Sequence, residues 1–263
     1  MLPGVYKETK KDNTPYFRAS ITHNKKHISL GSYDTEIQAS ATYSFAEEIL
    51  KNKEHSIYNY SFDYPIKFDK YISLVNLRDN HIYFANPIYL RKRNFSYFLS
   101  PFEEFIFDTD DLFYFSQHKI MARGNHYFVS EYGMQTSIRE RFGIKSFAVE
   151  GRDYRFANEN SLDYRRENII ILNQYHGVIK EVKNNKILYK TTIHIRSNYV
   201  VGRYKTEKEA AIAYNKAADT LTKNGFDRNF FQNYLEDISN KEYAEIYSSV
   251  KISDTVKNLK SPD

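Results

Sequence analysis

The chain has 263 residues, of which 41% are hydrophobic and 27% charged, and its net charge is +5. This length allows two or three small domains, and the 16% share of aromatic residues argues against disorder. The absence of cysteine excludes disulfide scaffolds and thiolate zinc sites. No apolar run approaches the roughly 18 residues of a membrane span, and the N-terminus lacks the apolar core of a signal peptide. We therefore expect a cytoplasmic protein that needs no cofactor.

The first predicted elements lie in residues 1–58. Apolar and polar residues alternate over Phe17–Thr22, which predicts a half-buried strand, and Asn24-Lys25-Lys26 predicts a hairpin turn. Thr35 and Gln38 have the spacing of a capping box that opens a helix. One face of that helix is expected to be apolar; it comprises Ala39, Tyr43, Ala46 and Leu50.

Residues 59–173 are rich in Tyr, Phe and Ile. The segment at 105–119 predicts a strand followed by a turn or short helix, and the segment at 124–133 predicts a hairpin. This region is expected to form a central mixed α/β domain.

An internal repeat links residues 30–50 to residues 201–221 at a constant offset of 171. Gly31 matches Gly202, and Tyr33 matches Tyr204. Upstream, Gly4-Val5 matches Gly177-Val178, with the offset drifting by one or two residues as expected for turns of different length. Residues 174–236 should therefore form a second copy of the fold predicted for residues 1–58.

The second copy carries the same signals. Thr206 and Glu209 form a capping-box pair, and Ser197-Asn198 predicts a turn. The expected apolar helix face comprises Ala210, Ala213, Tyr214, Ala217 and Leu221. Residues 237–263 predict one more helix and a disordered tail of about ten residues. The predicted fold class is α+β, with two small three-stranded antiparallel sheets, each covered by a helix on one face, flanking the central domain.

Positive charge is concentrated on the predicted sheets. Residues 7–33 carry a net charge of +4 and residues 177–205 a net charge of +6, which leaves −5 for the rest of the chain. Such a distribution suits a polyanion partner, although an ordinary solvated face is an equally good reading of charge alone. The cations in question are Lys7, Lys10, Lys11, Lys25 and Lys26 in the first copy and Lys180, Lys183, Lys186, Arg196 and Arg203 in the second.

Both copies resemble the AP2 DNA-binding domain of plant transcription factors and mobile-element proteins. The resemblance lies in the Gly-Val start, the strand ending at Leu30-Gly31 or Val201-Gly202, and the Thr-led Ala/Tyr helix. In that family the sheet lies in the major groove, as in other sheet readers. The resemblance implies DNA contacts at Tyr6, Glu8, Arg18, Ser20, His27 and Ser29 and at Ile179, Glu181, Lys190, Thr192, His194 and Asn198. The plant domains place Arg and Trp at several of these positions, so the target sequence cannot be transferred.

Residues 154–172 resemble the second half of HNH homing endonucleases. Such enzymes need a His to deprotonate water and an Asp and an Asn to hold a divalent cation. Phe156 and Arg155 occupy the His and Asp positions, and only Asn168 matches. His118, His126 and His176 are the remaining candidate bases. The resemblance implies an HNH relic without catalytic residues or metal, which could still contact DNA through Arg152, Arg155, Arg165 and Arg166.

These observations predict a non-catalytic, sequence-specific protein for double-stranded DNA, either a transcriptional regulator or a mobile-element derivative. It would be associated with a bacterial or phage nucleoid, or nuclear in a eukaryote, with no membrane partner and with homodimerisation left open. One alternative is an active HNH-type site-specific endonuclease with a rearranged metal site. The other is a protein-interaction module that mimics or binds a DNA-associated protein.

Overall fold

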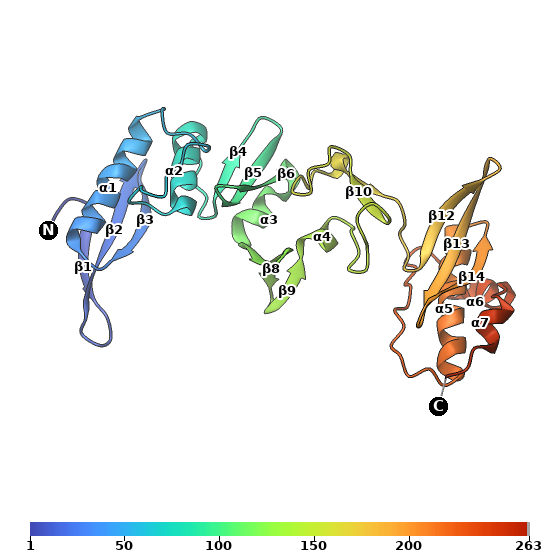
Figure 1. Ribbon diagram of the computed structural model, residues 1–263. Coiled ribbons are helices and arrows are strands. Elements are labelled where there is room, and N and C mark those ends of the chain that lie inside the picture. The colour runs from blue at the N-terminus through green and yellow to red at the C-terminus, as the bar shows by residue number, and fades with distance from the viewer. Residues whose placement is uncertain (262–263) are drawn as a thin grey trace. The chain divides into compact units, whose positions relative to one another are not determined.

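A computed structural model describes residues 1–261 (Figure 1). Over this range the fold is mixed α+β, with four three-stranded sheets, one two-stranded sheet and seven α-helices. Every strand pair in these sheets is antiparallel, and each three-stranded sheet is a meander whose strands follow chain order. The predicted class is confirmed at this level.

The chain divides into two compact units. The first comprises residues 1–138 and 160–168, and the second comprises residues 139–159 and the chain from Ile169 onward. The predicted boundaries after residues 58, 173 and 236 do not coincide with these limits. The reason is packing: one core joins Val5 of the first predicted domain to Leu77 and Phe98 of the central region, and the central region contributes to both units.

The first copy of the repeat forms the expected sheet and helix. Its elements are β1 (Val5–Thr9), β2 (Pro15–His23), β3 (Lys26–Tyr33) and α1 (Glu36–Lys51). Asn24 and Lys25 both have positive φ, which suits the two-residue hairpin turn between β2 and β3. Thr35 caps α1 by accepting a hydrogen bond from the Gln38 backbone amide, which forms one half of the predicted capping box.

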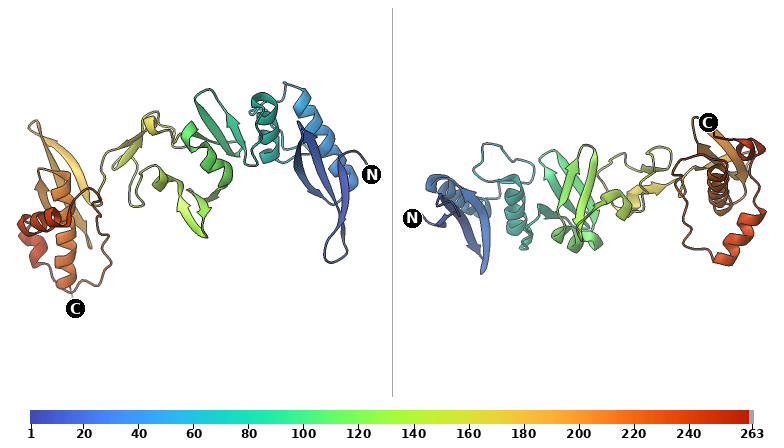
Figure 2. Two further views of the ribbon diagram at one scale, coloured as in Figure 1. Left: turned by 180° about the vertical axis from the view of Figure 1, so that it is seen from behind. Right: turned by 90° about the horizontal axis from the view of Figure 1, so that it is seen from below.

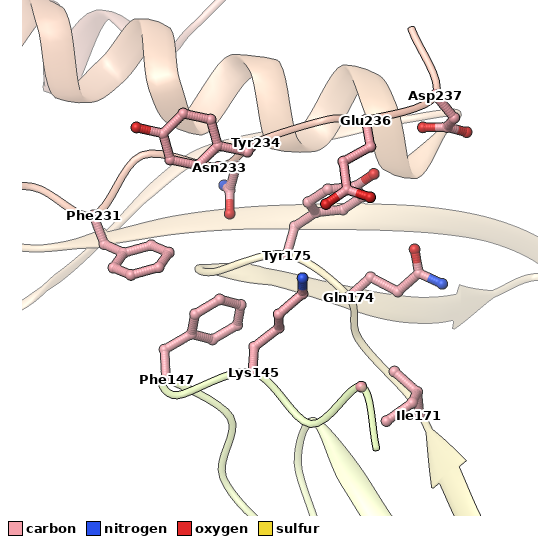
Figure 3. A pocket seen from close by; sticks show the side chains of 11 residues that line it. Lys145, Phe147, Ile171, Gln174, Tyr175, Phe231, Asn233, Tyr234, Glu236 and Asp237 are labelled. Carbon is pink, nitrogen blue, oxygen red and sulfur yellow. The ribbon is translucent and has the colours of Figure 1, made fainter. Parts of the chain in front are cut away.

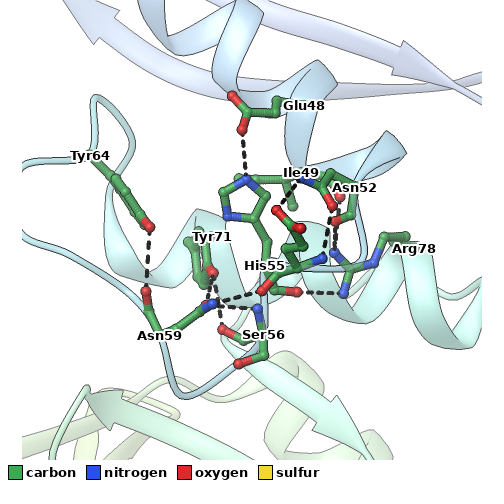
Figure 4. Close-up of polar contacts among 10 residues, drawn as sticks. Glu48, Ile49, Asn52, His55, Ser56, Asn59, Tyr64, Tyr71 and Arg78 are labelled. Carbon is green, nitrogen blue, oxygen red and sulfur yellow. Dashed lines mark hydrogen bonds and ion pairs between the residues drawn. The ribbon is translucent and has the colours of Figure 1, made fainter.

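Helix α2 (Phe68–Asn80) packs against α1 and gives the first copy a second layer. Arg78 of α2 joins them by donating hydrogen bonds to the carbonyls of Ile49, Asn52 and His55, at 3.1, 2.5 and 2.7 Å (Figure 4). These carbonyls lie at and beyond the end of α1, where backbone acceptors lack helical partners. The first copy is therefore tied to the central region by buried polar contacts as well as by apolar packing.

The rest of the first unit is built from two small meanders and short helices. Its elements are β4 (Ile88–Leu90), β5 (Asn94–Ser100), β6 (Glu103–Asp108), the 3₁₀ turns Thr109–Asp111 and Arg166–Asn168, α3 (Leu112–Gln117), β7 (Ile120–Arg123), β8 (His126–Glu131) and β9 (Met134–Ser137). The strand and short helix predicted for residues 105–119 are confirmed, whereas residues 124–133 form the single strand β8 with a turn at each end, which pairs with β7 and β9. The rings of Phe95, Phe105, Phe107 and Phe115 form the core here; Phe107 stacks on Phe105 and Phe115, and Phe95 lies tilted against Phe107 and Phe115.

The second unit contains the second copy, with the same order of elements (Figure 2). Its elements are β10 (Tyr154–Phe156), β11 (Ile169–Ile171), β12 (Val178–Lys183), β13 (Lys186–His194), β14 (Asn198–Tyr204) and α5 (Glu207–Lys223). Helix α4 (Ile138–Arg141) lies where the chain passes from one unit to the other. The capping box of Thr206 and Glu209 is complete.

The two copies share irregularities that are hard to produce by chance. A β-bulge falls between Ala19 and Ser20 in the first sheet and between Thr191 and Thr192 in the second. In each sheet the bulge leaves one residue, Leu30 or Val201, without a cross-strand partner. This residue lies directly before the glycine of the repeat and is buried. The predicted internal repeat is thus present in the backbone as well as in the sequence.

The tail after residue 237 is more ordered than predicted. Helices α6 (Asn240–Ser249) and α7 (Asp254–Asn258) pack on α5, and Val250, Ile252 and Val256 are buried in its core. The expectation of a disordered final segment is therefore wrong as far as residue 261; the last two residues lie outside the described range. The physical reason is that these apolar residues join the core that α5 forms with Ile193 and Val201 of the sheet, where the Ser253 amide donates a hydrogen bond to the Val201 carbonyl.

Candidate nucleic-acid interface

The first sheet presents a polar face opposite α1. Strand alternation places Val5, Ile21 and Ile28 toward the helix and the core. The other face carries Tyr6, Glu8, Arg18, Ser20, His27 and Ser29, the six positions implied by the resemblance. Across it, Tyr6 pairs with Arg18, and Ser20 pairs with Ser29. The structure thus brings the predicted first-copy positions together on one surface.

A hollow of about 310 Å³ opens on this face. Ala19 and the same six residues line it. Ser20 is the most deeply buried of the polar ones, at 7% exposure, and its Oγ has no hydrogen-bond partner. A buried hydroxyl without a partner is costly. The Ser20 Oγ is itself shielded from solvent, so the hollow presents mainly the polar groups of the other five residues.

The second sheet has an equivalent face. Its register places Ile179, Glu181, Lys190, Thr192, His194 and Asn198 on one side, away from α5. His194 Nδ1 lies 2.9 Å from Asn198 Oδ1, so these two side chains are held against each other. Arg203 pairs with Lys190 and joins this face. The second set of predicted positions is therefore also assembled.

A carboxylate lies among the cations of each face. Glu8 accepts hydrogen bonds from Arg18 Nη1 and from Tyr16 Oη, both at 3.1 Å. Glu181 accepts from Arg203 Nε at 2.9 Å, and Lys190 Nζ lies 3.6 Å from its other oxygen. The hydrogen bond from Arg203 lowers the pKa of Glu181 below its ordinary value of 4.5. Both faces therefore combine positive and negative groups rather than presenting cations alone.

The remaining predicted cations divide into two groups. Exposed turn and hairpin-end cations lie at the edges of the two sheets: Lys10, Lys11, Lys25, Lys183, Lys186 and Arg196. Lys7, Lys26 and Lys180 instead lie two residues from the buried Val5, Ile28 and Val178, and therefore on the helix-covered side of their sheets. Lys26 Nζ also lies 4.8 Å from the centre of the Tyr83 ring. These three lysines are therefore not on the polar faces that the other predicted residues share.

Two residues that complete the first face were not predicted. Tyr16 binds Glu8, and Ser32 pairs with Arg18 across the sheet. Tyr16 lies two residues before Arg18 in β2, so strand alternation alone would have placed it on this face. The bulge at Leu30 shifts the register of β3 by one residue, so a period-two pattern continued from Ser29 would have selected Gly31 in place of Ser32.

The central segment does not assemble the groups of an HNH site. Phe156 is 4% exposed and packs with Ile144 and Tyr154, so the position that the motif gives to His is a core position. Asn168 is also buried, and its side-chain amide donates to the Asp163 carbonyl at 2.8 Å. Among the described residues there is no cluster of three or more His, Cys, Asp or Glu side chains that could hold a metal ion.

The other candidate side chains of this segment are mostly engaged. Arg152, Arg165 and Arg166 form ion pairs with Asp153, Asp163 and Asp111, respectively. His118 stacks on Tyr114, and its Nδ1 lies 2.9 Å from the Tyr114 carbonyl oxygen. Arg155 and His126 are exposed.

His176 lies among Phe147, Tyr214 and Phe231, with ring centroids 5.0–5.5 Å away. Burial, reinforced by the charge of Arg152, lowers the pKa of His176 below 6.5. We infer a packed, neutral side chain rather than an exposed base.

A second hollow, of about 450 Å³, lies within the second unit (Figure 3). Phe147 and Phe231 stand side by side at one end, and Lys145 extends toward Tyr175. Glu236 and Asp237 lie at the other end. None of the predicted site residues lines it.

No protein-family model, no curated protein and no solved structure matches this chain. None of the helices within residues 1–261 has both the length and the apolar character to cross a bilayer.

Proposed function

We propose that this protein binds double-stranded DNA in a sequence-specific manner, with the polar faces of its two repeated sheets in the major groove. The observation that carries the proposal is the hollow on the first face, which unites Arg18, Ser20 and His27 with three other polar residues. A solvated face with no ligand gives no reason to gather donors and acceptors around a recess.

The distribution of charge supports the same function. Phosphate contacts position a protein on DNA, whereas hydrogen bonds to base edges specify the sequence. Free cations such as Lys25 and Lys186 lie at the sheet edges and suit phosphates. Arg18 and its neighbours lie inside the face and suit base edges; an Arg can donate two hydrogen bonds to a guanine.

The AP2-like character of the two copies is part of this proposal. The bulge, the glycine after it and the helix-covered face recur in both copies, and they supply the fold that a sheet reader needs. On this view the chain is a transcriptional regulator or a mobile-element derivative, and the HNH-like segment is a relic that does no chemistry. The burial of Phe156 supports the second part, because replacing a core ring by a charged base would be costly.

The test is selection of bound duplexes from a random pool by the full chain, followed by gel shifts with variants. Arg18→Ala should lose about fivefold to 100-fold in discrimination between the selected duplex and a scrambled one. Lys25→Gln should weaken binding to both duplexes equally and reduce the salt slope by about one.

Failure to enrich any sequence would overturn the proposal. Incubation of the selected duplex with Mg²⁺ or Mn²⁺ tests the alternative: metal-dependent cuts that Asn168→Ala abolishes would establish a nuclease instead.

A further inference from the structure

Each proposed reading face has one acid in its interior, at the same place in both copies. Glu8 and Glu181 match in the repeat, since each lies four residues after the glycine of the Gly-Val pair. Their partners also match. Arg18 and Lys190 both lie in the central strand, directly before the bulged segment, and each is the nearest central-strand cation to its acid. The arrangement therefore belongs to the module and not to one copy.

These ion pairs do little for stability. The side chains of Glu8 and Arg18 are 43% and 47% exposed, and exposed pairs contribute at most about 1 kcal/mol. The same carboxylate repels phosphates that the surrounding cations attract. A surface meant only to hold the DNA backbone would be better without it.

The hydrogen-bond geometry indicates what the acids do. Glu8 holds Arg18 by one guanidinium nitrogen, Nη1, which leaves the other donors of that group free. Tyr16 fixes the second carboxylate oxygen, so the acid itself is restrained from the opposite side. Glu181 holds Arg203 through Nε and leaves both of its terminal nitrogens free of this contact. Each acid thus orients a cation whose remaining donors stay available.

We propose that Glu8 and Glu181 are specificity-determining residues. Each holds a cation in position to read guanine. The carboxylate itself repels phosphate and accepts a hydrogen bond from the amino group of a neighbouring cytosine. Carboxylates accept from cytosine N4, as arginine donates to guanine O6 and N7. The centre of each face should therefore recognise a step of two G·C pairs, with binding strength supplied by the free cations at the edges. This inference rests on the proposed DNA binding.

The experiment compares the full-length protein with Glu8→Gln, Glu181→Gln and the double variant. Glu245→Gln, an exposed acid on α6 with no ion pair, removes the same charge away from both faces and is the matched control. Affinity is measured for the duplex selected by the wild type and for a scrambled duplex of equal composition, over a series of salt concentrations. Thermal unfolding verifies that each variant is folded.

The expected result is a loss of discrimination of about tenfold for each single variant. It should come mainly from tighter binding to the scrambled duplex, with a steeper salt dependence, because a repulsive charge has been removed. The control should bind as the wild type does. A purely structural role would change the unfolding temperature and leave the salt slope unaltered.

Different results would overturn the proposed function and this inference. A wild type that binds no duplex overturns the proposed function and this inference with it. A wild type that discriminates, with glutamine variants that discriminate equally well, overturns the inference alone, as does a selected sequence without a G·C step under either face.

Discussion

At the residue scale, the repeat is explained by close contacts that only glycine permits. Gly4 and Gly177 both have positive φ, and each lies against the ring of a helix tyrosine, Tyr43 or Tyr214. A Cβ on Gly177 would lie 2.5 Å from the Thr192 carbonyl oxygen and 2.6 Å from the Tyr214 ring. The Gly-Val pair of the repeat therefore marks the place where the start of the first strand of each sheet packs closely against the helix.

Gly177→Ala should lower the free energy of unfolding of the second unit by about 1–3 kcal/mol, because the variant adds both a backbone strain and a steric clash. Gly124→Ala is the control: its φ is also positive, but nothing lies within 4 Å of the added carbon. Chemical denaturation of the two variants measures the difference. Equal losses for both would mean that the clash with Tyr214 is absent.

His176 should make stability depend on pH. Burial lowers its pKa below the ordinary 6.5, so the unfolded chain binds a proton more readily than the folded one. The stabilisation from the neutral ring is complete above pH 6.5 and is lost as the pH falls below that value. His176→Phe, which also removes the unpartnered Nδ1, should weaken this dependence, as followed by denaturation at pH 7.5 and 5.5. The control variant His126→Phe, at an exposed position, should keep the pH dependence of the wild type. If the stability of His176→Phe fell with pH as steeply as that of the wild type, the dependence would not come from His176.

At the scale of elements, the helix of each copy is buried on more sides than its sequence suggests. The predicted face of α5 is confirmed, but Ala211, Ile212, Asn215 and Ala218 are buried as well. In α1 the buried positions include Thr42 and Ile49, while the predicted Tyr43 and Leu50 are only partly buried. Each helix lies between its sheet and a further layer, supplied by α2 for α1 and by α6 and α7 for α5.

Val256→Ala in α7 should therefore cost about 2 kcal/mol, from two methyl groups lost at a site with no exposure. The adjacent Thr255→Ala, at an exposed position, is the control. Chemical denaturation provides the free energies. A negligible cost for Val256→Ala would indicate that the tail does not stay docked on α5.

At the scale of the whole molecule, the proposed function makes the two sheets on one chain a bivalent ligand for DNA. Linkage raises the effective concentration of the second module once the first has bound. The affinity of the whole chain can then exceed the affinity of either module alone by about 10²–10⁴-fold. The chain passes between the units at three places, near residues 138, 159 and 168.

Removing the edge cations of the second sheet with Lys183→Gln, Lys186→Gln and Arg196→Gln should therefore weaken binding to the full selected site by about 100-fold or more. Binding to a duplex that contains only the first half-site should hardly change. Titrations on both duplexes measure this contrast, and an equal, small loss on both would show that the modules do not act together.

The sequence by itself determined the repeat, the two sheets, the hairpin turn of the first sheet at Asn24 and Lys25, and the cap residues of α1 and α5. These features are local: they depend on strand alternation, turn residues and cap spacing, which are properties of neighbouring residues. The tertiary structure decided the rest. It joined the first copy to α2 through Arg78, docked α7 on α5, shifted the register at the bulges and paired Glu8 with Arg18 and Glu181 with Arg203. Those outcomes depend on contacts between residues far apart in the chain, for which a single sequence contains no periodic signal.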